Sequence, residues 1–301
     1  MTVGKWISVL KEAMLDSQRN HTMAFAAGLS YYIVLSLFPA LIALSAVFSF
    51  LPVPNLFSQA LVLMARFVPA DSMGVVRQIL HDVVNPHRGA LLSFGLIGTL
   101  WTASSAFAGM IEALNVAYNV PETRPYWKTR GLAVLMTFLV GGLLLVALAM
   151  MLVGPEFGAW LARFLHASYI WVRIWPVIRW AVSGAFIVVA VESMYFLGPN
   201  VKQRFVHTLM GAVFSVAAWL TLSYFLGIYF QRFANFNRTY GALGGAIALM
   251  TWLYWSSFVI LLGAEINSEF LQVDGDGTLA LKQTPPEKVK PKPATESDVA
   301  A

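Results

Sequence analysis

The chain has 301 residues, of which 58% are hydrophobic and 12% are charged. Soluble domains carry about 25% charged residues, so the composition excludes an ordinary soluble protein and indicates one that lies in a membrane. Cysteine is absent, which excludes disulfides, thiolate metal sites and cysteine nucleophiles. The net charge of +5 is small, and its distribution along the chain is more informative than its sum.

Residues 1–23 form a segment of their own ahead of the first hydrophobic span. Apolar side chains recur there at helical spacing, at Val3, Trp6, Ile7, Leu10 and Met14. This pattern predicts an amphipathic helix on the cytoplasmic side. Such a helix can lie in the plane of the lipid headgroups or dock on a protein surface, and the sequence leaves both possibilities open.

Residues 24–270 contain six stretches that can cross about 30 Å of hydrocarbon, which requires about 20 helical residues. The predicted spans are approximately 24–50, 90–116, 131–153, 177–197, 208–230 and 241–264. We therefore predict an all-α fold, a polytopic membrane helix bundle with six transmembrane helices. Short amphipathic interfacial helices are predicted between spans one and two. Another follows span three, on the stripe Phe157, Trp160, Leu161, Phe164 and Leu165.

Lysine and arginine indicate how the bundle is oriented. They gather in the N-terminal segment, in the short loops 119–130 and 198–206, and after residue 270. Because cytoplasmic loops carry the excess of positive charge, both termini are predicted to be cytoplasmic. Residues 271–301 are rich in proline and lysine and poor in apolar side chains, a composition that predicts a disordered tail.

Several polar side chains fall within the predicted spans, where an ionised carboxylate costs at least about 2.5 kcal/mol. One interpretation is a polar vestibule that opens to the cytoplasm. Its lining would comprise carboxylates, amides and phenols: Glu112, Asn115, Glu192, Glu265, Asn267, Tyr31 and Tyr32. The other interpretation is structural, because the glutamates can equally cap or bridge helices and pair with Arg124, Lys128 or Arg130.

The last span begins with small residues at Gly241, Gly244, Gly245 and Ala248. Small side chains at this spacing allow two helices to approach closely, so we predict a packing face there.

The sequence offers little support for enzyme chemistry. Its five histidines form no H-x-H or H-E-x-x-H arrangement, and no G-x-S-x-G elbow or P-loop occurs. We therefore predict no catalytic residues, no metal site and no cofactor. Nucleic-acid binding is not expected either, because it requires a basic soluble surface and the cytoplasmic loops are too short to form one.

Several segments, in this order, carry a family resemblance. They are AGLSYY and LSLFP at 27–39, LWTAS at 100–104, ALNVAY at 113–118, PETRPYWKTR at 121–130 and the span that ends on GAEIN at 263–267. Together they resemble the YihY/BrkB family of bacterial inner-membrane proteins, over about residues 15–270. The resemblance implies a six-span, multi-pass protein of the bacterial cytoplasmic membrane.

Some members of that family have carried a ribonuclease label, which this sequence does not support because it has no metal-ligand cluster. Links of other members to lipid handling in the envelope imply transport of a lipid or other amphipathic molecule. The expected partners are therefore membrane lipid and an amphipathic substrate. The alternative is a non-transporting scaffold in an assembly of the cell envelope.

Overall fold

The computed structural model describes residues 3–49, 61–62, 64–65, 73–74, 89–164, 169–232 and 243–274. These residues form helices and no β-strand, so the all-α prediction is confirmed for the part of the chain described. The helices are α1 (Val3–Arg19), α2 (Thr22–Ser49), α5 (Gly89–Ala117), α6 (Tyr126–Leu152), α7 (Gly154–Phe164), α8 (Tyr169–Leu197), α9 (Phe205–Arg232) and α11 (Leu243–Asp274).

Four of the described helices are long and apolar enough to cross a membrane. Their spanning parts are Tyr126–Leu152, Arg173–Leu197, Phe205–Phe230 and Gly244–Leu271, which correspond to predicted spans three to six. The predicted spans 24–50 and 90–116 fall on α2 and α5, whose side chains are only partly described. The total of six spans therefore stays a prediction.

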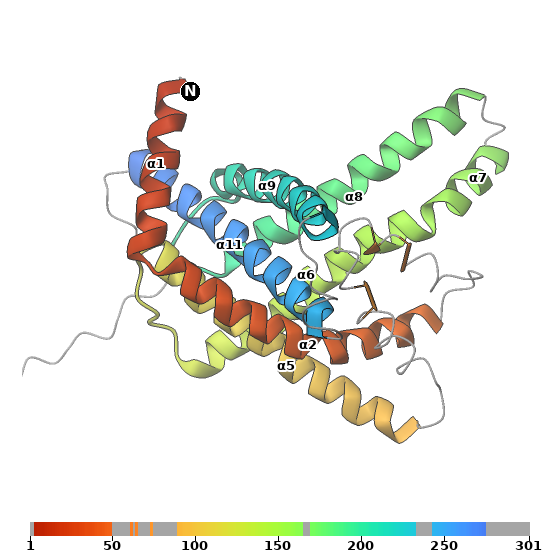
Figure 1. Ribbon diagram of the computed structural model, residues 1–301, viewed down its shortest axis with the longest axis horizontal. Coiled ribbons are helices and arrows are strands. Elements are labelled where there is room, and N and C mark those ends of the chain that lie inside the picture. Colours follow the sequence, from red (N-terminus) through yellow and green to blue (C-terminus); the bar gives the residue numbers. More distant parts are fainter. Residues whose placement is uncertain are drawn as a thin grey trace, which may run out of the picture.

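The long helices form a closed ring in which each helix contacts the next. The order around the ring is α2, α5, α6, α8, α9 and α11, and α11 then contacts α2. In Figure 1 the six helices come together on the left, while the pair α6–α8 and the pair α2–α5 point apart on the right. The bundle is therefore closed at one end and spread at the other.

We call the convergent end the closed end, defined by residues 20–22, 118–125 and 198–204 and by the last three turns of α11. The largest buried side chains of the described residues gather near it, and they include Ile111, Leu114, Tyr118, Tyr195 and Leu261. The side chains that fix the packing of the ring thus lie beside the two short connections, α5–α6 and α8–α9.

Two helix boundaries at the closed end depend on a residue with positive φ. His21 and Asn119 both have a φ of 52°, the left-handed conformation that ends a helix at little cost for asparagine. His21 separates α1 from α2, and Asn119 follows the last turn of α5. Each turn therefore changes the direction of the chain within a few residues, which brings polar side chains from both sides of the turn close together.

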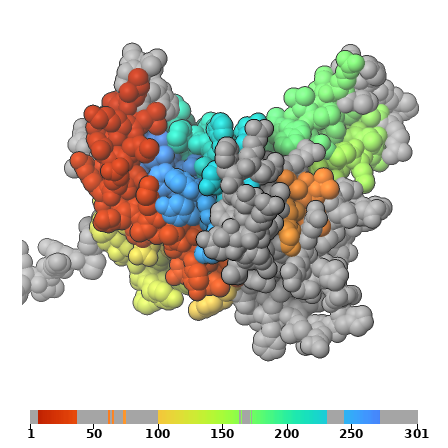
Figure 2. Space-filling model, in the orientation of Figure 1, coloured from red at the N-terminus to blue at the C-terminus, as the bar shows by residue number. Residues whose placement is uncertain are grey.

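Helix α1 is docked on the bundle. Its Val9 and Ala13 are buried against Ile266 and Phe270 of α11, and Figure 2 shows α1, in red, lying beside the blue surface of α11. Ile7 and Met14, together with other apolar side chains of α1, remain exposed. The helix therefore uses one face to dock on protein, and its second apolar face is free to contact headgroups.

Helix α7 agrees with the amphipathic helix predicted after span three. It forms a hairpin with α8, held by Trp175 Nε1, which donates to the carbonyl of Gly154 at 2.6 Å, and by Trp171 Nε1, which donates to that of Gly158 at 3.2 Å. The rings of Phe157, Trp160 and Phe164 stack along α7 and are exposed, and the ring of Phe157 also contacts Trp175 of α8. Most of the amphipathic region predicted between spans one and two lies outside the described residues, as does the predicted tail beyond residue 274.

Candidate functional site

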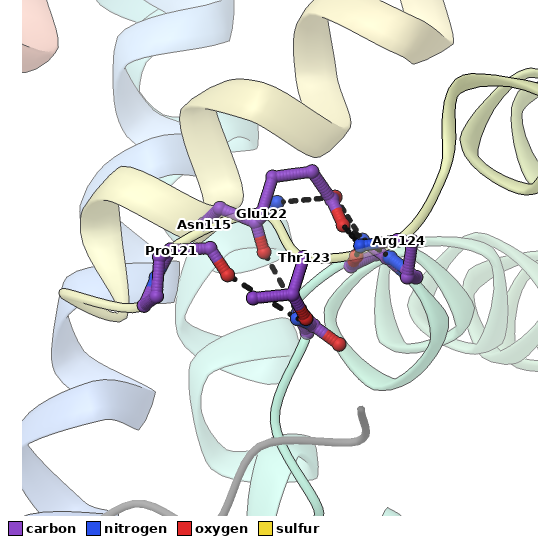
Figure 3. Close-up of polar contacts among 7 residues, drawn as sticks. Asn115, Pro121, Glu122, Thr123 and Arg124 are labelled. Carbon is purple, nitrogen blue, oxygen red and sulfur yellow. Dashed lines mark hydrogen bonds and ion pairs between the residues drawn. The ribbon is translucent and has the colours of Figure 1, made fainter. Parts of the chain in front are cut away.

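The connection between α5 and α6 is tied to the end of α8 by a polar network, which Figure 3 shows. Asn115 lies at its centre. Its Nδ2 donates to Glu122 Oε2 at 2.8 Å, and its Oδ1 accepts a hydrogen bond from the backbone N–H of Asn200 at 2.7 Å. The amide of Asn200 in turn donates to Thr123 Oγ1 at 2.8 Å and to the carbonyl of Pro121 at 3.2 Å. We call these residues, with Arg124, the loop network.

Arg124 completes the loop network. Its guanidinium contacts both oxygens of Glu122, at 2.8 and 2.6 Å, and also donates to the carbonyl of Gly198 at 2.8 Å. The Arg124 side chain is 7% exposed, whereas that of Glu122 is 31% exposed. A bidentate pair of this kind fixes both partners in orientation as well as in distance. The loop network therefore holds the α5–α6 and α8–α9 connections in one arrangement.

Partial burial alone would raise the pKa of Glu122. The hydrogen bonds and the positive charge of Arg124, with the hydrogen bond from Asn115, outweigh burial and lower its pKa below the usual value. Glu122 is therefore ionised at neutral pH, as the network requires.

Acid should weaken this network. The pKa of Glu122 is lower in the folded chain than in the unfolded chain, where it is about 4.3. The stabilisation is thus complete above that value and is lost as the pH falls toward the pKa of the folded state. We expect the unfolding temperature in detergent to fall with acidification below about pH 4.3, and to fall less steeply in Glu122→Gln. Equal slopes for the two proteins would contradict this assignment.

A second polar layer lies between α8, α9 and α11. Glu192 of α8 is fully buried and its Oε1 contacts the hydroxyl of Thr208 on α9. Asn267 of α11 joins the same turn of α9, since its Nδ2 donates to the carbonyl of Thr208 at 2.9 Å and its Oδ1 accepts from Gly211 N–H at 2.8 Å. Glu192 and Asn267 are thus brought together through one residue, Thr208.

Two buried tyrosines border this second layer. Tyr195 Oη donates to the carbonyl of Ile260 at 2.5 Å and lies 2.7 Å from Ser215 Oγ, so it joins α8 to both α9 and α11. Tyr118, directly after α5, is also fully buried, and its side chain lies next to Asn267 although its hydroxyl makes no hydrogen bond of good geometry. Oε2 of Glu192 is likewise without a partner.

Glu265 belongs to a third contact, at the turn between α1 and α2. Asn20 Nδ2 donates to its two oxygens at 3.1 and 3.3 Å, and Thr22 Oγ1 donates to Oε1 at 3.1 Å. The carboxylate is 1% exposed. Glu265 therefore fastens the start of the ring to its last helix, so that both Glu192 and Glu265 join neighbouring helices.

Glu112 lies apart from these buried groups. It is exposed and lines a pocket of about 230 Å³ between α2 and α5, together with apolar groups of both helices. The lining residues are Ala24, Phe25, Gly28, Leu29, Tyr32, Gly109 and Glu112. Glu112 is the one carboxylate in this lining. Tyr32 is 41% exposed, and Tyr31 beside it is 55% exposed. The two rings meet edge to face, with their centroids 5.9 Å apart.

The predicted site residues are therefore distributed over four places at or near the closed end. Asn115 is in the loop network, Glu192 and Asn267 share the layer around Thr208, and Glu265 binds the α1–α2 turn. Glu112 and Tyr32 share the surface pocket. Tyr118 lies close enough to interact with Glu192, Asn267 and Glu265, and a common vestibule that also includes Asn115, Glu112 and the two exposed tyrosines stays a prediction.

Sequence reasoning did not select several residues that organise these places: Tyr118, Glu122, Tyr195, Asn200 and Thr208. Asn200 follows Gly198-Pro199 at the end of a span, and a polar residue after such a turn is a signal for a structural contact. Within the part of the chain that the structure describes, no group of three or more histidines, aspartates or glutamates could hold a metal ion.

Comparison with known proteins places the chain among bacterial membrane proteins. The sequence profile of the family described as virulence factor BrkB matches residues 13–287. A protein of Bacillus subtilis (strain 168) named as the ribonuclease-like protein YfkH is 35% identical over 262 residues, which make up 87% of this chain and 94% of that protein.

More distant similarity extends to UPF0761 membrane proteins. The one from Xanthomonas oryzae pv. oryzae (strain PXO99A) is 27% identical over 248 residues, or 81% of this chain. The one from Rhodospirillum centenum (strain ATCC 51521 / SW) is 24% identical over 262 residues, or 87% of this chain. The chain spans 56% and 57% of the length of these two relatives. No solved structure matches the chain.

Proposed function

Because the chain belongs to the BrkB family of membrane proteins, as the family match over residues 13–287 shows, we propose that it moves a lipid whose headgroup carries an ammonium group within the bacterial cytoplasmic membrane. A proposal of transport needs a place where such a molecule can bind and a bundle that can open. The pocket between α2 and α5 is the candidate for the first, and the spread end of the ring is the candidate for the second.

The pocket beside Glu112 is the observation that carries the proposal. Apolar side chains and glycines from α2 and α5 form most of its wall, and one carboxylate stands at its edge. An apolar wall suits an acyl chain, and a single carboxylate at the same place suits an ammonium group. Glu112 is exposed, so a headgroup reaching the pocket from the surrounding lipid can contact it directly.

The arrangement of the ring supports the second requirement. The closed end is held by the loop network and by the contact of Glu265 with the α1–α2 turn, whereas α2–α5 and α6–α8 separate toward the other end (Figure 1). Helix pairs that are fixed at one end and spread at the other can move as rigid bodies about the fixed end. The pocket lies between the members of one such pair, so it would keep its lining and travel with that pair relative to the rest of the ring.

Lipid movement in reconstituted vesicles tests this function. The protein is placed in vesicles that contain a phosphatidylethanolamine labelled on its acyl chain, and the accessible fraction of label is followed with a membrane-impermeant quencher. We expect the protein to accelerate transfer between leaflets. Glu112→Gln should reduce the rate about tenfold, because a hydrogen bond to a charged group contributes about 1.5 kcal/mol.

Two controls make the result specific. Glu156→Gln removes an exposed carboxylate from α7, away from the pocket, and should leave the rate unchanged. A labelled phosphatidylglycerol, which has no cationic group, should not respond to Glu112→Gln. If the wild-type protein moves neither lipid, the transport proposal is wrong and the scaffold alternative is favoured.

A further inference from the structure

Glu192 is a buried carboxyl group with no cation to balance it. It is 0% exposed, on the face of α8 that packs against α9. No lysine, arginine or histidine of the described residues forms an ion pair with it, and its Oε2 has no hydrogen-bond partner. An ionised carboxylate in such a place would leave a charge both desolvated and unpaired, which costs several kcal/mol. The neutral acid avoids that cost.

The hydrogen bonds at Thr208 point to the same form of Glu192. The hydroxyl oxygen of Thr208 contacts Glu192 Oε1 and also lies 3.0 Å from the carbonyl oxygen of Phe205. A threonine hydroxyl has one proton to donate, and both of these neighbours are acceptors when Glu192 is ionised. Two separate hydrogen bonds form when Glu192 carries a proton, which it donates to Thr208 while Thr208 donates to Phe205; an ionised Glu192 would have to share the single Thr208 proton with Phe205.

The surrounding groups offer an ionised Glu192 no other support. Asn267 already uses its amide for the backbone of Thr208 and Gly211. The titratable side chains close enough to interact electrostatically are Tyr118 at the end of α5 and Tyr195 on α8 itself, and Glu265 of α11 faces Tyr118. These groups are neutral or negative, so none of them favours a second negative charge at Glu192.

We propose that Glu192 is a proton-binding site that is occupied when α8 and α9 are packed together and emptied when they separate. On emptying, the O–H bond of the carboxylic acid breaks, its electron pair stays on the carboxylate and the proton passes to water that enters between the helices. The buried Tyr118 lies close enough to interact with Glu192. If the protein transports lipid as proposed above, the proton is then its coupling ion.

Infrared spectroscopy of the protein in vesicles tests the site directly, because a protonated carboxylic acid has a C=O stretching band that a carboxylate lacks. At neutral pH an exposed glutamate, with a pKa of about 4.3, contributes nothing to this band. We expect the wild-type protein to show the band at neutral pH and Glu192→Gln to lower its intensity, because Glu265, which is also buried and, among the described residues, bound only by Asn20 and Thr22, can contribute the rest. Glu156→Gln should keep the full intensity. Absence of the band in the wild type, or equal intensity in the wild type and Glu192→Gln, would overturn the proposal.

A second variant keeps the test decisive if Glu192→Gln does not insert correctly. Thr208→Val retains Glu192 but removes its hydrogen-bond partner, so the band should shift to higher frequency. An unshifted band would overturn the assignment. The outcome is separable from that of the lipid assay. If the band depends on Glu192 but no lipid moves, the proton site is supported and the transport proposal is wrong. If lipid moves but the band is absent, the proton site is wrong and the transport proposal is unaffected.

Discussion

Replacing Gly263 with alanine should lower the free energy of unfolding by about 3 kcal/mol, the upper part of the range for overpacking in a tight core. A Cβ at Gly263 would lie 1.8 Å from Ser215 Oγ and 2.9 Å from the carbonyl oxygen of Gly211, and 2.7 Å from Tyr195 Oη. The backbones of α9 and α11 approach too closely at this point to admit a methyl group. The new side chain would also disturb the contact between Tyr195 and Ser215.

Thermal unfolding in detergent, followed by tryptophan fluorescence, measures the effect. Gly227→Ala is the matched control, because it adds the same methyl group to α9 where nothing lies within 4 Å. An alanine there should be neutral or slightly stabilising, since glycine is a poor helix former. If the two variants unfold at the same temperature, α9 and α11 are not in the close contact described.

The second large effect is expected from Arg124→Ala, which should lower stability by about 2 kcal/mol. The change removes three hydrogen bonds at once and leaves the carbonyl of Gly198 and the carboxylate of Glu122 without their main donor. The partial exposure of Glu122 keeps the loss below that of a fully buried pair. The rate of amide hydrogen exchange in segments 118–125 and 198–204 should be higher in Arg124→Ala than in the wild type, because Arg124 connects the two segments.

The matched control for Arg124 is Lys128→Ala, which removes another positive charge from the same segment at an exposed position. It should change the stability by less than about 0.5 kcal/mol. A double variant of Arg124 and Glu122 should be less destabilised than the sum of the single variants, because the two side chains bind each other. Additive effects would mean that the pair contributes nothing of its own.

Hydropathy predicted the four spanning helices closely because it depends on short-range composition. The predicted span 208–230 lies within Phe205–Phe230, and 177–197 lies within Arg173–Leu197. The aromatic stripe of α7 was predictable for the same reason, since period and side-chain type are local properties. The family resemblance was confirmed because its segments, including PETRPYWKTR, are also read directly from the chain.

Pairings between distant segments were not predictable from these patterns. Small residues at the start of the last span indicated a packing face, and Gly244, Gly245 and Ala248 are indeed buried. A close approach of that helix to α9 nevertheless occurs at Gly263, beside Gly211 and outside the predicted face. Likewise, the structural interpretation offered Arg124 as one of three possible partners for a glutamate inside a span, whereas Arg124 binds Glu122 two residues away and the carbonyl of Gly198. Neither the contact at Gly263 nor the partners of Arg124 can be predicted without knowing which segments the fold brings together.

The contact of Asn20 and Thr22 with Glu265 also bears on biogenesis. Ribosomes make the α1–α2 turn first and Glu265 about 240 residues later, so the turn stays unsatisfied through most of synthesis. The contact between α11 and α2 that completes the ring can form only after α11, the last described helix, has entered the bilayer.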